Sequence, residues 1–166
     1  DRAGAGKFRG GAPYFRDYRF TEREAVLQVR SDRARFRPYG LYGGMPGQPS
    51  ANYLNPQDNN QKLTSKPTMI IQEGDVFRHE LAGGGGWGDP LERDPADVLR
   101  DVRNELVSIT SAKNDYGVIF DNELINVDSN KTNALRQTMR EKRAGAKLPF
   151  VAWDDHGTET ALEAAD

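Results

Sequence analysis

Four consecutive glycines constrain this chain more than any other feature of its sequence. They lie in AGGGGWGDP at residues 82–90, between a run typical of a strand and a run typical of a helix. Glycine loses more backbone freedom on folding than any other residue, but it allows positive φ and close contact without a Cβ. We therefore expect this loop to pack closely against other backbone, with its tryptophan buried to anchor it. The loop residues concerned are Gly83, Gly84, Gly85, Gly86, Trp87 and Asp89.

Two stretches partly match nucleotide-binding motifs, and neither match is complete. Residues 83–88 match G-x-G-x-x-G, but Asp89 and Pro90 follow where a helix should begin. Residues 3–11, AGAGKFRGG, fail the P-loop pattern because Asp1 and Phe8 stand where Gly and Ser or Thr are required. The sequence therefore predicts no nucleotide site on this chain.

The same basic stretch leaves two cations, Lys7 and Arg9, in glycine-rich chain. Such a stretch can accept an anion, and we expect both side chains to line an anion-accepting surface that faces partner chains. A solvated basic loop is the alternative, and composition alone favours it.

Composition excludes several classes of protein. The formal net charge of the 166 residues is −2, which argues against non-specific nucleic-acid binding, and the absence of cysteine excludes disulfides and thiolate chemistry. No apolar run approaches the roughly 20 residues of a membrane helix, and no signal peptide is visible. We therefore expect a cytoplasmic protein without nucleic-acid or membrane partners. Because the chain begins at Asp1 rather than Met, we expect it to be processed or part of something longer.

Periodicity predicts an α+β fold that is rich in strands and loops, with two to three helices. Residues 31–67 carry almost no pattern and are expected to form a long loop that is functional or packed on a partner. Residues 118–120 and 124–127 are expected to pair as a hairpin. The other expected elements are strands at 14–20 and 24–30, a hairpin of 68–72 with 75–81, and helices that begin at Asp94–Pro95, at Ile109 and at Asn130.

The histidines do not predict a metal site. His79 and His156 are the only two, and they lie far apart without a ligand spacing. His156 follows Asp154 and Asp155, but a chain terminus is a poor place for a rigid site. No nucleophile–base pair can be read from spacing either, so the residues predict no self-contained active site and no catalytic residue.

Several stretches together resemble the C-terminal part of hydantoinase B/oxoprolinase proteins. The resemblance covers about residues 3–127 and is most specific in GDVFRHELAGGGGWGDPLERDP at 74–95. It divides the chain into a hydantoinase B-like segment at 1–127 and a polar helix with a tail at 128–166. The other stretches that carry it are GAGKFRGG (4–11), RSDR (30–33), GLYGGMPG (40–47), the SK pair at 65–66, DVRNELVS (101–108) and DYGVIFD (115–121).

The resemblance implies a place in an ATP-dependent enzyme that opens cyclic amides, through a phosphorylated substrate oxygen and attack at the activated carbon. It implies a hydantoinase A-like ATP-binding subunit and the N-terminal part of a hydantoinase B-like subunit as partners. ATP, Mg and a catalytic divalent metal are then expected on those chains, and none is expected on this one. A segment of an acetone- or acetophenone-type carboxylase and a non-catalytic assembly module are the alternatives.

Overall fold

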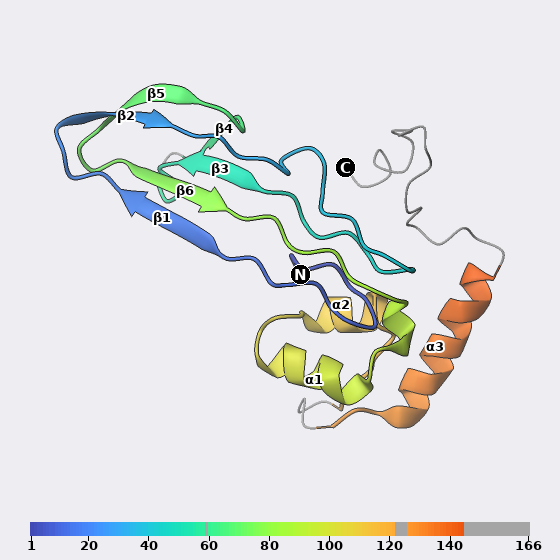
Figure 1. The fold of residues 1–166 in the computed structure, drawn as a ribbon. Helices are drawn as coiled ribbons and strands as arrows, with labels where there is room; N and C mark the ends of the chain where they lie inside the picture. Colours follow the sequence, from blue (N-terminus) through green and yellow to red (C-terminus); the bar gives the residue numbers. More distant parts are fainter. Residues whose placement is uncertain (59, 122–125, 145–166) are drawn as a thin grey trace, which may run out of the picture.

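The computed structural model describes residues 1–58, 60–121 and 126–144 (Figure 1). Strands and helices occupy separate regions, which confirms the expected α+β class. The helix expected to begin at Asn130 begins one residue earlier, at Ser129. The elements are β1 (Phe15–Arg19), β2 (Glu24–Gln28), β3 (Ala51–Leu54), β4 (Gln61–Leu63), β5 (Thr68–Gln72), β6 (Val76–Glu80), η1 (Pro90–Glu92), α1 (Pro95–Arg103), α2 (Ile109–Asn114) and α3 (Ser129–Arg143).

One long antiparallel ribbon dominates the strand region. Strand β1 pairs with β6 from Phe15↔Glu80 to Arg19↔Val76, and β2 pairs with β5 farther along the same two stretches of chain. The expected hairpin of 68–72 with 75–81 is therefore wrong. The turn at Gly74, where φ is +90°, forms a corner in the ribbon, and its N–H donates to Phe20.

The ribbon folds back at this corner, so that β2 and β5 lie over the four-stranded sheet of order β1-β6-β3-β4 (Figure 1). Phe77, Leu54 and Ile71 are buried in this region. Period-two alternation places Phe77 and Leu54, which are opposite each other in the β3–β6 register, on the same face of the sheet.

The long patternless segment at 31–67 is only partly a loop. It contributes β3, which pairs with both β6 and β4 and so lies inside the sheet. The loop expectation missed β3 and its partner β4 because these strands are only four and three residues long, although the sequence between them, NPQDNN at 55–60, is rich in turn residues.

The helices pack on a second apolar core. Asp94 caps α1 by accepting from the Ala96 N–H, with Pro95 at the first helical position, as the sequence predicts. This core joins side chains from α1 and α2 to Ala5 near the N-terminus: Ala5, Val98, Val107, Ala112, Tyr116 and Val118, with Met45 packed against it.

Helix α3 is polar, and it binds the rest of the fold through arginines. Arg136 donates to the carbonyl oxygens of Tyr116 (2.9 Å) and Arg93 (2.8 Å), and Thr132 donates to that of Ile119. The buried residues of α3 are Thr132 and Arg136, whereas Ala134 is exposed and Leu135 and Met139 are half-buried. Residues on both sides of position 127 thus share one hydrogen-bond network.

Phe120 and Val127 form a bridge, which is the pairing that the expected hairpin at 118–127 requires, although its residues 122–125 lie outside the described residues. The tail from residue 145, with His156 and its neighbouring aspartates, also lies outside them. No described helix is long and apolar enough to span a membrane.

Candidate functional site

Glycine-rich stretches from three parts of the chain converge between the sheet and the helices (Figure 1). We call them the glycine bundle, and define it as the segments 2–6, 8–11, 38–41, 44–48 and 82–88. The last of these is the central segment, and backbone hydrogen bonds join it to each of the other four.

The hydrogen bonds of the central segment repeat every three residues. The N–H groups of Gly83 and Gly86 donate to Gln48 (3.0 Å) and Met45 (2.9 Å), both in segment 44–48. Those of Gly84 and Trp87 donate to segment 8–11, and that of Gly88 donates to segment 38–41. A period of three is that of a polyproline II helix, whose N–H and C=O groups point outward and can bind neighbouring chains.

The central glycines lie against backbone, as expected from the sequence. A Cβ on Gly83, Gly85 or Gly86 would lie less than 3.0 Å from the carbonyl oxygen of Arg2, Tyr39 or Ala5, in that order. The contacts are reciprocal, because a Cβ on Gly4, Gly10, Gly44 or Gly47 would meet the central segment or its neighbours equally closely. None of the four central glycines has positive φ, so space rather than backbone conformation requires them.

Trp87 departs from the expectation, because it is not buried. It is 44% exposed at the end of the bundle, where its backbone exchanges two hydrogen bonds with Phe8. Its ring lies 5.5 Å from that of Phe8 and 5.4 Å from that of Tyr42. We call Phe8, Leu41, Tyr42 and Trp87, all of them exposed, the aromatic patch.

Tyr42 holds its place in the patch at a conformational cost. It follows Leu41 in a turn closed by a hydrogen bond from the Gly44 N–H to the Leu41 carbonyl, and φ is +52° at Tyr42 and +92° at Gly43. Two positive φ values are typical of a type I′ turn, whose first central position favours Asn, Asp or Gly. A tyrosine there is strained, and its presence favours a role for the exposed ring.

Lys7 and Arg9, the two expected anion-binding residues, both contact carboxylates of this chain. Lys7 pairs with Glu92 at 3.2 Å in an exposed contact, and Arg9 donates to Asp101 at 2.9 Å in a mostly buried one. Their expected role toward partner chains stays a prediction, and the geometry favours Lys7 for it because Arg9 is largely covered.

Asp101 ties the bundle to α1, and it was not predicted from the sequence. Its carboxylate accepts from Arg9 and, at 2.8 Å, from Arg93, so that two guanidinium groups share one buried acid. Arg93 also donates to the Lys7 carbonyl oxygen. The sequence feature that could have revealed Asp101 is its place as an acidic residue three positions after Val98, on the apolar face of the predicted helix.

Asp89, expected in the glycine loop, caps the next element. Its carboxylate accepts from the Leu91 N–H at 2.9 Å and pairs with Arg143 at the end of α3 at 3.2 Å. It therefore joins the end of the central segment to the end of α3.

His79 has a structural role in the sheet. Its Nδ1 lies 2.7 Å from the buried Asn52 Oδ1, while the Asn52 amide donates to Ser31 and Thr64. Burial, and then the charge of Arg16, lowers the pKa of His79 below its usual value. Within the described residues, no group of three or more His, Asp or Glu side chains could hold a metal ion.

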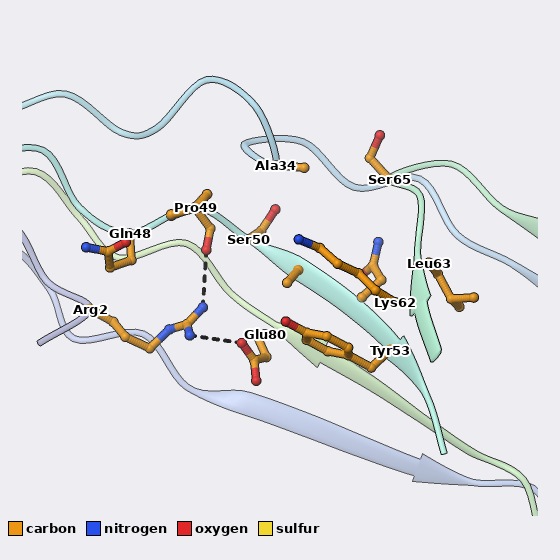
Figure 2. A pocket seen from close by; sticks show the side chains of 12 residues that line it. Arg2, Ala34, Gln48, Pro49, Ser50, Tyr53, Lys62, Leu63, Ser65 and Glu80 are labelled. Atoms are coloured by element: carbon orange, nitrogen blue, oxygen red, sulfur yellow. Dashed lines mark hydrogen bonds and ion pairs between the residues drawn. The ribbon is translucent and has the colours of Figure 1, made fainter. Parts of the chain in front are cut away.

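A depression of about 200 Å³ opens on the sheet (Figure 2). Arg2 lines one side, where it pairs with Glu80 at 2.9 Å and donates to the Pro49 carbonyl, and Lys62 and Tyr53 line the other. Ser50 donates to the Asp32 carbonyl rather than to a general base. The depression can bind a polar group, but it lacks an activated nucleophile.

Comparison with known proteins identifies the family. The sequence profile described as hydantoinase B/oxoprolinase matches residues 1–90, which include all five segments of the glycine bundle. The chain belongs to the hydantoinase B/oxoprolinase family.

Relatives and solved structures extend the match beyond residue 90. The B-type subunit of a putative D-/L-hydantoinase from Pseudomonas sp. is 33% identical over 136 residues, which cover 80% of this chain and 22% of the relative. The crystal structure of ATP-dependent caprolactamase from Pseudomonas jessenii matches with a TM-score of 0.65 and 31% identity, over 80% of this chain and 24% of that one.

Nucleotide-free acetone carboxylase matches in fold alone, with a TM-score of 0.64 and 20% identity, over 89% of this chain and 24% of that one. The chain spans about a quarter of the length of the curated relatives it matches.

Proposed function

We propose that this chain is the C-terminal segment or a small subunit of an ATP-dependent enzyme that hydrolyses cyclic amides. The observation that carries the proposal is the match to ATP-dependent caprolactamase in both sequence and fold. In the proposed reaction, the amide oxygen of the ring takes the γ-phosphoryl group of ATP and ADP leaves. Water then attacks the activated carbon, inorganic phosphate is released, and the C–N bond breaks with the nitrogen taking up a proton, which opens the ring. A hydantoinase A-like subunit would bind ATP and Mg, and the N-terminal part of a hydantoinase B-like subunit would hold the catalytic metal.

The proposed contribution of this chain is structural. The glycine bundle fixes backbone from three parts of the sequence without side chains between them, and Asp101 fastens it to the helices. Such a scaffold can fix the positions of partner chains relative to one another. A chain with this assembly role can still be part of the proposed enzyme.

A carboxylase segment is the second candidate, and the fold match to acetone carboxylase favours it. Substrate identity separates the two. The native complex should be purified through this chain, its other subunits identified by mass spectrometry, and ATP consumption measured with hydantoin, 5-oxoproline or caprolactam. Acetone with bicarbonate serves as the parallel assay. A linear amino acid, or an N-carbamoyl amino acid from hydantoin, supports the hydrolase, and a keto acid supports the carboxylase.

We predict that the isolated chain hydrolyses none of these amides, with or without ATP. The reason is that its P-loop pattern fails and its described residues offer no metal-binding cluster. Turnover should be followed by release of the linear product and of inorganic phosphate from the purified chain. ATP-dependent turnover by that chain alone contradicts the prediction.

A further inference from the structure

The depression on the sheet carries more positive than negative charge (Figure 2). Arg2 and Lys62 are its basic lining residues, and Glu80 is the acidic one. Arg2 pairs with Glu80 at 2.9 Å, whereas none of the ion pairs among the described residues involves Lys62. One positive charge of the lining is therefore left unmatched.

Hydrogen-bond donors from two strands accompany this charge. Tyr53 of β3 lies directly opposite Lys62 of β4, so the two side chains share one face of the sheet. Figure 2 shows both pointing toward the side of the depression where Arg2 lies. The Tyr53 hydroxyl makes no hydrogen bond to another described residue, and Arg2 uses its terminal nitrogens for Glu80 and the Pro49 carbonyl. Because a guanidinium carries five N–H donors, some remain for a further acceptor.

A basic loop is fixed at the rim of the depression. Ala34, which lines it, stands between Arg33 and Arg35, and both arginines are exposed. φ is +64° at Arg33, a conformation that residues other than glycine rarely adopt. The buried Ser50 fixes this loop, because its N–H donates to the Arg33 carbonyl at 2.9 Å and its hydroxyl donates to the Asp32 carbonyl. Strained backbone that is held in this way is often found at ligand sites.

We propose that the depression is a binding site for a small oxyanion, either a phosphate or a carboxylate. Residues 30–37, which include the rim, contain four arginines and one aspartate, although the whole chain has a net charge of −2. Ammonium, guanidinium and hydroxyl groups are the donors that proteins use for phosphate and carboxylate oxygens. The volume of about 200 Å³ is smaller than the roughly 300–1,000 Å³ of sites for drug-sized ligands, so it suits a small anion. The site does not depend on the reaction proposed above.

Amide chemical shifts of the full ¹⁵N-labelled chain test the site in a titration. Inorganic phosphate and succinate are the two anionic probes, and succinamide is the neutral control, all at constant ionic strength. We expect saturable shifts, largest at Ser50, Ala51 and Tyr53, with a Kd roughly in the millimolar range for one or both anions. A response to phosphate alone identifies a phosphate site, and a response to succinate alone identifies a carboxylate site. Shifts that do not saturate with either anion, or equal shifts with succinamide, overturn the proposal.

Substitution of Lys62 separates the site from general attraction to a basic surface. Lys62→Gln removes the unmatched charge and should weaken the binding of the responding anion about three- to tenfold. The matched control, Lys113→Gln, makes the same change of charge on α2 and should leave the Kd unchanged. Equal weakening in the two variants overturns the proposal, as does an unchanged Kd in Lys62→Gln.

Tyr53→Phe supplies a second test that keeps the ring and the net charge. It removes only the hydroxyl donor, so we expect the Kd to rise roughly two- to threefold. Circular dichroism should first show that each variant is folded. If Lys62→Gln is not folded, Tyr53→Phe decides in its place, and an unchanged Kd in this variant then overturns the proposal.

Discussion

The glycine bundle and the bent ribbon both join distant parts of the chain through backbone hydrogen bonds, but they exclude water in different ways. In the ribbon, side chains alternate between faces, and buried residues such as Phe77 and Ile71 supply the apolar surface. In the bundle, the backbone of one segment fills the space where the Cβ of the next would stand. The ribbon therefore requires side chains of a particular type, whereas the bundle leaves no room for a side chain of any type.

Glycines in the two regions show the difference. Gly74 in the ribbon corner has φ of +90°, and no heavy atom lies within 4 Å of the place that a Cβ would take, so conformation requires it. Gly85 in the bundle has ordinary φ and no space. The same residue type is thus needed for two separable physical reasons.

The largest expected effect comes from adding one methyl group to the bundle. Gly85→Ala places a Cβ against the Tyr39 carbonyl and should destabilise the chain by more than about 3 kcal/mol, since neither backbone can move without breaking hydrogen bonds. Urea unfolding followed by circular dichroism measures it. The matched control is Gly11→Ala, where a Cβ meets nothing within 4 Å, and it should change stability by less than about 0.5 kcal/mol. Equal effects at the two positions would mean that lack of space for a Cβ is not what requires glycine at Gly85.

The next effect tests how the bundle is fastened to the helices. Asp101→Asn leaves two guanidinium groups without their shared carboxylate and should cost about 3 kcal/mol, because a buried charge without its partner is strongly destabilising. Asp97→Asn on the same helix removes an exposed pair with Arg100 and should cost about 0.3 kcal/mol. Urea unfolding of both variants gives the comparison. A small loss in Asp101→Asn would mean that packing alone holds the bundle on α1.

A smaller effect is expected at the ribbon corner. Gly74→Ala forces a Cβ into the left-handed region and should cost about 1–2 kcal/mol, without any steric contact. Thermal melts are sufficient to detect it. A loss as large as that in Gly85→Ala would show that the corner, too, is limited by space.

The smallest effect concerns pH and is confined to the sheet. The pKa of His79 is lowered in the folded chain, so below about pH 6.5 the unfolded chain binds the proton more readily. Stability should therefore fall as the pH drops from about 6.5 toward the lowered pKa, and His79→Gln should lack this part of the decline. Urea unfolding of both proteins between about pH 5 and 8 measures the difference, which should be constant above about pH 7. A difference that does not change at lower pH contradicts the assignment.

Local patterns predicted most of the elements and little of their pairing. The alternation in EAVLQVR predicts β2, and the Asp94–Pro95 cap predicts the start of α1. The pair Glu73–Gly74 has the residues of a hairpin turn, yet β5 and β6 bind strands that lie far from them in the sequence. Turn chemistry is local, whereas a ladder partner is chosen by the whole fold.

The candidate site, too, could be predicted only in part from local sequence patterns. Four consecutive glycines predict close contact between backbones, because few other arrangements offset the backbone entropy that these residues lose on folding. Which backbone they meet is set by the glycines near residues 4–10 and 40–47, and no local pattern links these to the run. The exposure of Trp87 also depends on where the bundle ends. The Arg9–Asp101 pair spans 92 positions and could not be read from spacing.

Amide hydrogen exchange tests the central claim most directly, because the bundle is held by backbone hydrogen bonds. Selective ¹⁵N-glycine labelling makes the N–H groups of Gly4, Gly83, Gly84 and Gly86 observable, all of which donate within the bundle. We predict that these amides exchange at least about a hundredfold more slowly than in an unstructured peptide, as slowly as those of the ribbon core. Exchange within a few-fold of the unstructured rate, while the ribbon remains protected, would contradict the packing of backbone on backbone.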